Sequence, residues 1–323
     1  YAEDPYRGFL PSSGRVQRFR PPDDTKGVRV DTGICEGGEV SLHYDPMIAK
    51  LVTHGSDRDL AAQTMLRALD RFEIRGIQSN IPFLAALVQH PRFLAGETTT
   101  GFIEEEFPEG FSGNALSQDI IRRIVALVGV VHEHWHLRED AHAVIPQTQS
   151  ADRVVQIDED QYAVSVITDQ DGWQATVEGE TVSIEFSNSP FSSVIDFYAD
   201  GIEVTAQLRR TGVRYEVFHS GASVDALVLE SHSAALYHLM PRKVAPDLSH
   251  LTLSPMPGLL VSVAVTEGAE VKAGDALVVI EAMKMENVIR AERDGTVLCV
   301  HAEPGEALEV DQQIIEFVRE SSA

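Results

Sequence analysis

The sequence has little of three features that would assign it to large functional classes. Only two cysteines occur in 323 residues, which argues against a disulfide-rich secreted fold and indicates a reducing compartment. No uninterrupted apolar run approaches the roughly 18 residues that a membrane-spanning helix requires. Basic residues are outnumbered by acidic ones, 26 against 50, and the net charge of −24 repels nucleic acid and anionic membranes. We therefore expect no nucleic-acid partner and no membrane partner.

The sequence also lacks an initiator methionine, a secretory leader and any glycine-rich loop suited to ATP phosphates. We expect it to be the C-terminal part of a longer chain. Hydrophobic residues make up 43% and charged residues 24%, the usual composition of a globular protein with real cores. The length indicates two or three domains.

Residues 1–113 alternate between strand-like and helix-like stretches, which predicts an α+β unit. The helix predicted over 57–72 has Leu60, Met65, Leu66 and Leu69 at helical spacing, and Asp57 is placed to cap it. A second helix, over 81–90, should end near Pro91. Strands are predicted over 27–30, 39–44 and 48–55.

One long amphipathic helix is predicted over 117–138, with Ser117 as its cap. The apolar residues that repeat at intervals of three and four are Ile120, Ile124, Leu127, Val128, Val131 and Trp135. A polar linker is expected over 139–152. Between 153 and 230, strand-like runs alternate with glycines about every ten residues, which predicts an antiparallel barrel or sandwich. Because the helix predicted over 117–138 is so apolar, we expect it to pack against this sheet or to run inside the barrel that the sheet forms.

The last unit, 251–319, repeats itself. Gly258 and Gly295 are 37 positions apart, as are Gly268 and Gly305. Two copies of strand, glycine turn and strand predict a small flattened barrel with quasi-twofold symmetry. A tight hairpin over 281–287 lies between the copies and places Lys284 at an exposed tip. A linker with two prolines is expected before this unit, over 241–250.

One motif looks like a metal site but favours a different interpretation. Residues 132–142 match H-E-x-x-H with a further His142, the ligand spacing of some zinc proteases. That pattern needs glycine at position 139, where this chain has Glu139. Because the segment also continues a buried amphipathic helix, we expect no metal here.

Glu281-Ala282-Met283-Lys284-Met285-Glu286 resembles the biotinyl domain of biotin-dependent carboxylases, in which the modified lysine lies between two methionines. The upstream PMPG at 255–258 belongs to the same pattern. The resemblance implies covalent biotin on Lys284, with Ala282, Met283 and Met285 around it. The lysine side chain and the attached biotin would form a flexible tether, which would present the biotin to two active sites at a high effective concentration. A lipoyl domain shares the fold, but its hairpin typically reads Asp-Lys-Ala.

Residues 1–113 resemble the C-terminal subdomain of biotin carboxylase, at 2–5, 9–16, 27–33, 44–51 and, more loosely, 75–81. By this resemblance Arg29 aligns with the catalytic arginine, which binds bicarbonate and stabilises the negative charge that biotin acquires. A guanidinium suits that role because it stays charged and its planar fork matches paired anionic oxygens. Without the resemblance, Arg29 would be interpreted as half of a strand-edge salt bridge.

The order of the units resembles the α subunits of biotin-dependent acyl-CoA carboxylases. It implies the end of an ATP-grasp biotin carboxylase (1–113), a helix with an antiparallel barrel for subunit interaction (114–240), a linker (241–250) and a biotinyl flattened barrel (251–320). Within the family the propionyl-CoA carboxylases are most similar, and LMP at 239–241 belongs to that likeness. The methylcrotonoyl-CoA carboxylases share the plan.

The resemblance implies a ligase that carboxylates biotin with ATP and bicarbonate and passes the carboxyl group to a carboxyltransferase β subunit, giving methylmalonyl-CoA from propionyl-CoA. ATP and Mg²⁺ or Mn²⁺ would bind mainly upstream of this sequence, so these residues alone should be inactive. Further implied partners are biotin protein ligase and an acyl-CoA held by the β subunit. The expected assembly is a large hetero-oligomer such as α6β6, in the bacterial cytoplasm or mitochondrial matrix. The alternative from another class is a non-catalytic biotin carrier and assembly module.

Overall fold

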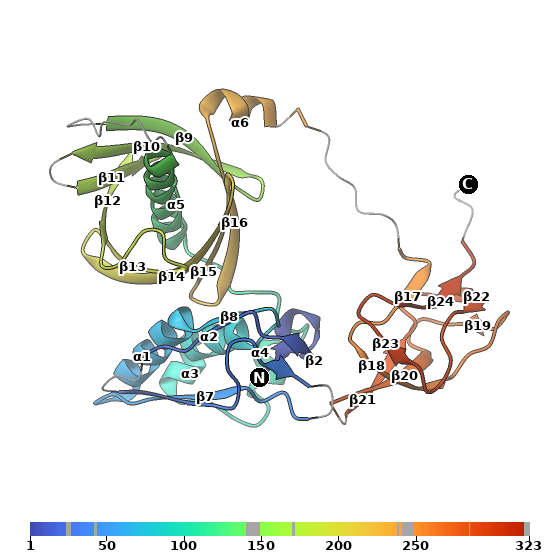
Figure 1. Ribbon diagram of the computed structural model, residues 1–323. Helices are drawn as coiled ribbons and strands as arrows, with labels where there is room; N and C mark the ends of the chain where they lie inside the picture. The colour runs from blue at the N-terminus through green and yellow to red at the C-terminus, as the bar shows by residue number, and fades with distance from the viewer. Residues whose placement is uncertain are drawn as a thin grey trace.

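The computed structural model describes residues 1–23, 27–41, 44–139, 149–169, 172–237, 239–240, 248–283 and 285–319. They form an N-terminal segment (1–113), a barrel segment (114–237) and a C-terminal segment (248–319), which lie side by side in Figure 1. Both cysteines are free. Among the described helices, none is both long and apolar enough to cross a membrane.

Within its described residues, the N-terminal segment combines four α-helices and one 3-10 helix with two-stranded sheets, which confirms the α+β prediction. Strand β6 is shorter than the run predicted over 39–44, and residues 42 and 43 lie outside the described residues. The chain also forms a helix at Pro91, where only a helix end was expected, because proline fits the first helical position. The elements are β1 (Glu3–Asp4), the 3-10 helix η1 (Pro5–Arg7), β2 (Leu10–Pro11), β3 (Gly14–Arg15), β4 (Arg18–Arg20), β5 (Val28–Thr32), β6 (Glu39–Val40), β7 (Ala49–Thr53), α1 (Arg58–Arg71), β8 (Glu73–Arg75), α2 (Ile81–Gln89), α3 (Pro91–Ala95) and α4 (Phe102–Glu106).

Helix α1 begins where the sequence predicts it to begin. The Asp57 side chain accepts a hydrogen bond of 2.8 Å from the backbone N–H of Leu60, which satisfies one free donor of the first turn. Its inward face buries Ala62, Ala68 and Leu69. Leu69 belongs to the hydrophobic cluster of this segment, together with Val16, Val40, Ile48, Phe72 and Ile81 among others.

The barrel segment closes eight antiparallel strands into a complete barrel in the order β10-β11-β12-β13-β14-β15-β16-β9. Closure leaves no free sheet edge, which removes the hazard of edge-to-edge aggregation. The linker predicted over 139–152 is too long, because β9 already begins at Gln149 and extends the ladder to β10. The elements are α5 (Gln118–Glu139), β9 (Gln149–Ile157), β10 (Asp160–Asp169), β11 (Gly172–Val177), β12 (Glu180–Phe186), β13 (Val194–Ala199), β14 (Ile202–Thr211), β15 (Arg214–His219), β16 (Ala222–Leu229) and α6 (Ser231–Tyr237).

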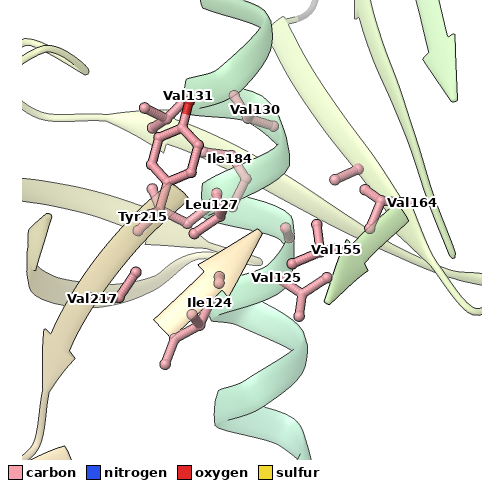
Figure 2. Packing of buried hydrophobic residues seen from close by; sticks show 14 of the residues in the cluster. Ile124, Val125, Leu127, Val130, Val131, Val155, Val164, Ile184, Tyr215 and Val217 are labelled. Atoms are coloured by element: carbon pink, nitrogen blue, oxygen red, sulfur yellow. The ribbon is translucent and has the colours of Figure 1, made fainter. Parts of the chain in front are cut away.

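Helix α5 runs inside the barrel, one of the two arrangements that its apolar sequence allows (Figures 1 and 2). Figure 2 shows Leu127 and Val131 among inward side chains of the strands such as Tyr215. Gly129 permits a close approach, since a Cβ there would lie 3.1 Å from Val164 Cγ1. Glycine inside a helix is less favourable than alanine by about 1 kcal/mol. Here that cost is offset by the tight packing of α5 against β10.

The C-terminal segment consists of two four-stranded sheets with the internal symmetry that the repeat predicts. The sheets have the orders β17-β24-β22-β19 and β21-β20-β18-β23. The short strand of each half pairs with a strand of the other half. Strand β19 of the first half pairs with β22, and β23 of the second half pairs with β18. The strands are β17 (Leu251–Leu253), β18 (Gly258–Val263), β19 (Glu270–Val271), β20 (Ala276–Ala282), β21 (Met285–Arg290), β22 (Gly295–Val300), β23 (Ala307–Leu308) and β24 (Gln313–Phe317).

Candidate functional site

The first candidate site is the β20–β21 hairpin of the C-terminal segment. Its last pair is Ala282 opposite Met285, so the connection consists of Met283 and residue 284 alone. Lys284, the predicted biotin site, lies outside the described residues. Met283 has φ of 50°, the left-handed conformation that tight two-residue hairpins require and that side chains other than glycine seldom adopt.

The stem of this hairpin is fixed by close backbone packing. A Cβ on Gly258 would lie 2.7 Å from the carbonyl oxygen of Glu281 and equally close to Ile280 Cγ2. Strand β18 can therefore support β20 closely only because position 258 is glycine. Ala282 is buried, whereas Met285 is 51% exposed. The hairpin thus combines a rigid base with an accessible outer strand.

The two methionines of the hairpin differ sharply in their surroundings. Met283 is only 2% exposed, and it belongs to the hydrophobic cluster of the N-terminal segment, with Ala2, Val16 and Val40, rather than to the core of its own segment. Sequence reasoning missed this contact, and its one available signal was an apolar side chain at a hairpin tip.

Arg29, the second predicted site residue, lies on the outer face of the β5–β7 ribbon. Its Nη2 is 3.3 Å from Asp31 Oδ2, and the two side chains are 65% and 56% exposed. An ion pair so exposed contributes about 0–1 kcal/mol, so the guanidinium can exchange Asp31 for another anion at little cost. Lys50 lies opposite Asp31 in the ribbon.

The structure connects these two sites through one hydrophobic cluster. Val30, next to Arg29 in β5, points to the opposite face and packs against the cluster that contains Met283. The ribbon that bears Arg29 and the hairpin that precedes Lys284 are therefore both supported by the N-terminal core.

The H-E-x-x-H stretch forms the outer end of α5. His132 Nδ1 lies 3.0 Å from the Tyr215 hydroxyl, and Glu133 Oε1 lies 2.9 Å from Arg153 Nε. Burial lowers the pKa of His132 to about 4, and burial raises the pKa of Tyr215 to about 12. His142 lies outside the described residues. In the part of the chain that the structure describes, no three His, Cys, Asp or Glu side chains are grouped to hold a metal ion.

Three consecutive stretches of the chain match known families. Residues 1–105 match the biotin carboxylase C-terminal domain, residues 125–243 the propionyl-coenzyme A carboxylase BT domain, and residues 251–317 the family described as biotin-requiring enzyme.

Individual relatives agree with this order. The chain is 39% identical to the propionyl-CoA carboxylase alpha chain of Ruegeria pomeroyi, over 98% of this chain and 50% of that protein. It is 33% identical to the mitochondrial propionyl-CoA carboxylase alpha chain of Mus musculus, over 98% of this chain and 45% of that protein. The mitochondrial methylcrotonoyl-CoA carboxylase subunit alpha of Dictyostelium discoideum is 30% identical over 92% of this chain and 44% of its own length. The chain thus spans about half the length of these relatives.

Proposed function

Because this chain belongs to the family of biotin-dependent acyl-CoA carboxylase α subunits, we propose that it carries covalent biotin on Lys284 within a longer carboxylase subunit. The observation that supports this most directly is the hairpin, in which the strand pair ends at Ala282 and Met285 and leaves a two-residue connection on a rigid stem. Such a tip can enter the active site of a ligase, and later of a carboxylase, without unfolding the sheet that supports it.

The chain's residues fit this cofactor in distinct ways. Bound biotin would supply a ureido nitrogen that takes up a carboxyl group. Ala282 is buried and keeps the stem narrow, while Met285 and Glu286 are exposed and available to biotin protein ligase. Gly258 holds the strand beneath the stem at close range. The tip therefore moves with the whole C-terminal segment.

Arg29 is proposed as the catalytic residue of this chain. Its guanidinium would bind bicarbonate and hold the negative charge that develops during carboxyl transfer, as a preorganised cation at the reacting atoms. ATP and Mg²⁺ or Mn²⁺ would be bound mainly by residues of the longer subunit outside this sequence. The 323 residues alone should therefore not carboxylate biotin.

The barrel segment is proposed to bind the carboxyltransferase β subunit, on which the acyl-CoA would lie. The order of matched families favours propionyl-CoA as substrate and methylmalonyl-CoA as product, and methylcrotonoyl-CoA is the alternative. We retain the boundaries 1–113, 114–240, 241–250 and 251–320 for the functional units. We further propose a hetero-oligomer such as α6β6, in the bacterial cytoplasm or the mitochondrial matrix. The bacterial and mitochondrial relatives support only the two alternative locations.

The test of the attachment is intact mass and avidin binding of the full-length subunit purified from its native cell. The expected result is one biotin in the natural protein and none in a Lys284→Arg variant. A lipoyl mass at this position, or an unmodified lysine, would refute the proposal.

The non-catalytic alternative is separated by Arg29→Gln in the full-length subunit. Removing a charge-stabilising donor typically costs about 10²–10³ in kcat, so bicarbonate-dependent ATP hydrolysis should fall by that factor. Arg15→Gln is a matched control, because Arg15 is also an exposed strand arginine of the N-terminal segment. Unchanged hydrolysis in Arg29→Gln would favour the carrier and assembly module.

A further inference from the structure

The contact between Met283 and the N-terminal segment goes beyond the attachment of biotin. Met283 is 2% exposed although it occupies the tip of a hairpin, where side chains normally face solvent. It belongs to the same hydrophobic cluster as Ala2, Val16 and Ile48 of the N-terminal segment. Covering a methionine in this way removes a large apolar side chain from water and favours the docked arrangement.

The backbone of Met283 supports the same conclusion. Its φ of 50° is uncommon for a residue with a side chain, and a glycine would adopt it without strain. The strain of this backbone conformation has to be offset by an interaction outside the turn. Here that interaction is the burial of the Met283 side chain in the N-terminal cluster. Met285, two residues away and 51% exposed, makes no comparable contact.

The rest of this contact is loosely packed. Arg7 and Leu10 of the N-terminal segment share a cavity of about 580 Å³ with Leu253 and Val288 of the C-terminal segment. A second cavity, of about 220 Å³, lies between Ser12 and Pro255. Two cavities between the N-terminal segment and the barrel measure only about 190 and 210 Å³. Because permanent interfaces are packed as densely as protein interiors, the contact with the 580 Å³ cavity is the one better suited to repeated separation.

We propose that Met283 is a docking residue, whose side chain joins the N-terminal cluster that includes Ala2, Val16, Val40 and Ile48 and holds the biotin-bearing hairpin reversibly on the carboxylase segment. The inference rests on the proposed function for its purpose, since the docked partner is the segment that bears Arg29. The flanking methionines then have separate tasks: Met283 docks the hairpin, and Met285 stays free on the outer strand.

The test uses the full-length, biotinylated subunit with Met283→Gly and Met283→Ser. The matched control is Leu298→Ser, because Leu298 is an apolar residue of β22 in the same segment that is 51% exposed and lies outside the hairpin. Met283→Gly removes the side chain and also relieves the strained turn, so any loss of docking cannot come from a destabilised hairpin. Met283→Leu keeps an apolar side chain of similar size and should behave like the natural protein. Intact mass must show equal biotin content in all four variants.

Two measurements report docking. Hydrogen exchange of the peptides that contain Ala2 and Val40 should become about tenfold faster in Met283→Gly and Met283→Ser, because burial of one large apolar side chain corresponds to at least that factor. Carboxylation of the attached biotin should slow by a similar factor, while carboxylation of free biotin added to the same subunit should keep its kcat and KM.

Equal exchange rates in the Met283 variants and in Leu298→Ser would overturn the inference, as would equal carboxylation of the attached biotin. The exchange measurement needs no biotin. A subunit that proves unmodified at Lys284 but loses protection in Met283→Gly would therefore refute the proposed function and leave the docking contact established.

Discussion

The N-terminal segment makes two contacts that differ in their buried polar groups and in the size of their cavities. Toward the barrel it offers buried polar groups: Ser220 donates its backbone N–H to Asp70 Oδ1 at 2.7 Å, and Gln207 donates to the carbonyls of Asp70 and Phe72 at 3.0 and 3.1 Å. Toward the C-terminal segment it offers an apolar cluster that receives one methionine, beside open cavities.

The difference indicates which contact is fixed and which can open. A hydrogen bond contributes about 0.5–1.5 kcal/mol net, and about 1.5–3 kcal/mol where one group is charged, so the several bonds across the barrel contact together make its separation expensive. An apolar side chain that leaves its cluster loses only its burial, about 1.5–3 kcal/mol. The barrel is therefore a fixed base for the N-terminal segment, whereas the C-terminal segment can leave and return.

The largest expected effect comes from Asp70→Ala. Asp70 is 2% exposed, accepts from Ser220 and lies 3.1 Å from His219 Nδ1. Removing one partner of a buried pair typically costs about 3–5 kcal/mol, because the other group stays buried and unpaired. Hydrogen exchange at the Ser220 amide measures this directly, since that N–H donates to Asp70.

Asp59→Ala on the same helix is the control for Asp70→Ala. Asp59 is exposed in the first turn of α1, so its removal should cost below about 1 kcal/mol. Protection of Ser220 that survives Asp70→Ala would mean that the barrel contact is not fixed by this pair. The contrast with the Met283 contact would then lose its basis.

A smaller effect is expected from Gly221→Ala, which tests how closely the barrel and the N-terminal segment are packed in the same contact. A Cβ at position 221 would lie 2.7 Å from the carbonyl oxygen of Pro82 and 2.9 Å from Ala85 Cβ, both in α2. Overpacking of this kind costs about 1–3 kcal/mol, and the measurement is again exchange at Ser220. Gly212→Ala is matched, because Gly212 has φ of 63° in a similar turn with no atom within 4 Å of the added Cβ. Equal losses in both variants would assign the effect to backbone strain.

Much of the fold could be predicted because its signals are local. Helix α5 follows from apolar residues at helical spacing, and Ser117 caps it as predicted, with its Oγ 3.3 Å from the N–H of Ile120. The strands between 153 and 230 follow from alternation and glycine turns, and the doubled C-terminal segment follows from its repeat. Each of these patterns lies within one helix, one strand and its turn, or one repeat, so the sequence shows it without knowledge of the tertiary packing.

The two contacts of the N-terminal segment could not be predicted, because each joins residues far apart in the chain. Ser220 and Asp70 are separated by 150 positions, and neither position carries a motif. The two methionines around Lys284 have the same residue type, so the sequence could not show that one is buried and the other exposed. Burial against another segment is a property of tertiary packing rather than of local pattern.

The smallest expected effect is a pH dependence of the barrel contact, carried by His219. Burial opposes its charged form, but the hydrogen bond and the charge of Asp70 prevail and raise the pKa of His219 above its ordinary value. Its ring also faces the carbonyl of Thr205, at 2.8 Å from Nδ1, and the Ser220 hydroxyl, at 3.2 Å from Nε2, while the charge of Arg123 acts against protonation.

The sign of this dependence follows from the direction of the shift. A histidine whose pKa is raised in the folded state contributes stability that is complete below the unfolded value of about 6.5. That stability is lost as the pH rises through the higher folded value. The free energy that protects the Ser220 amide should therefore decrease from pH 6 upward, once intrinsic exchange rates are corrected, and His219→Gln should remove this slope. A slope that persists in His219→Gln would show that another group titrates in the barrel contact. Hydrogen exchange at the Met283 hairpin should not depend on the protonation of His219 in either protein, because His219 lies in the barrel contact.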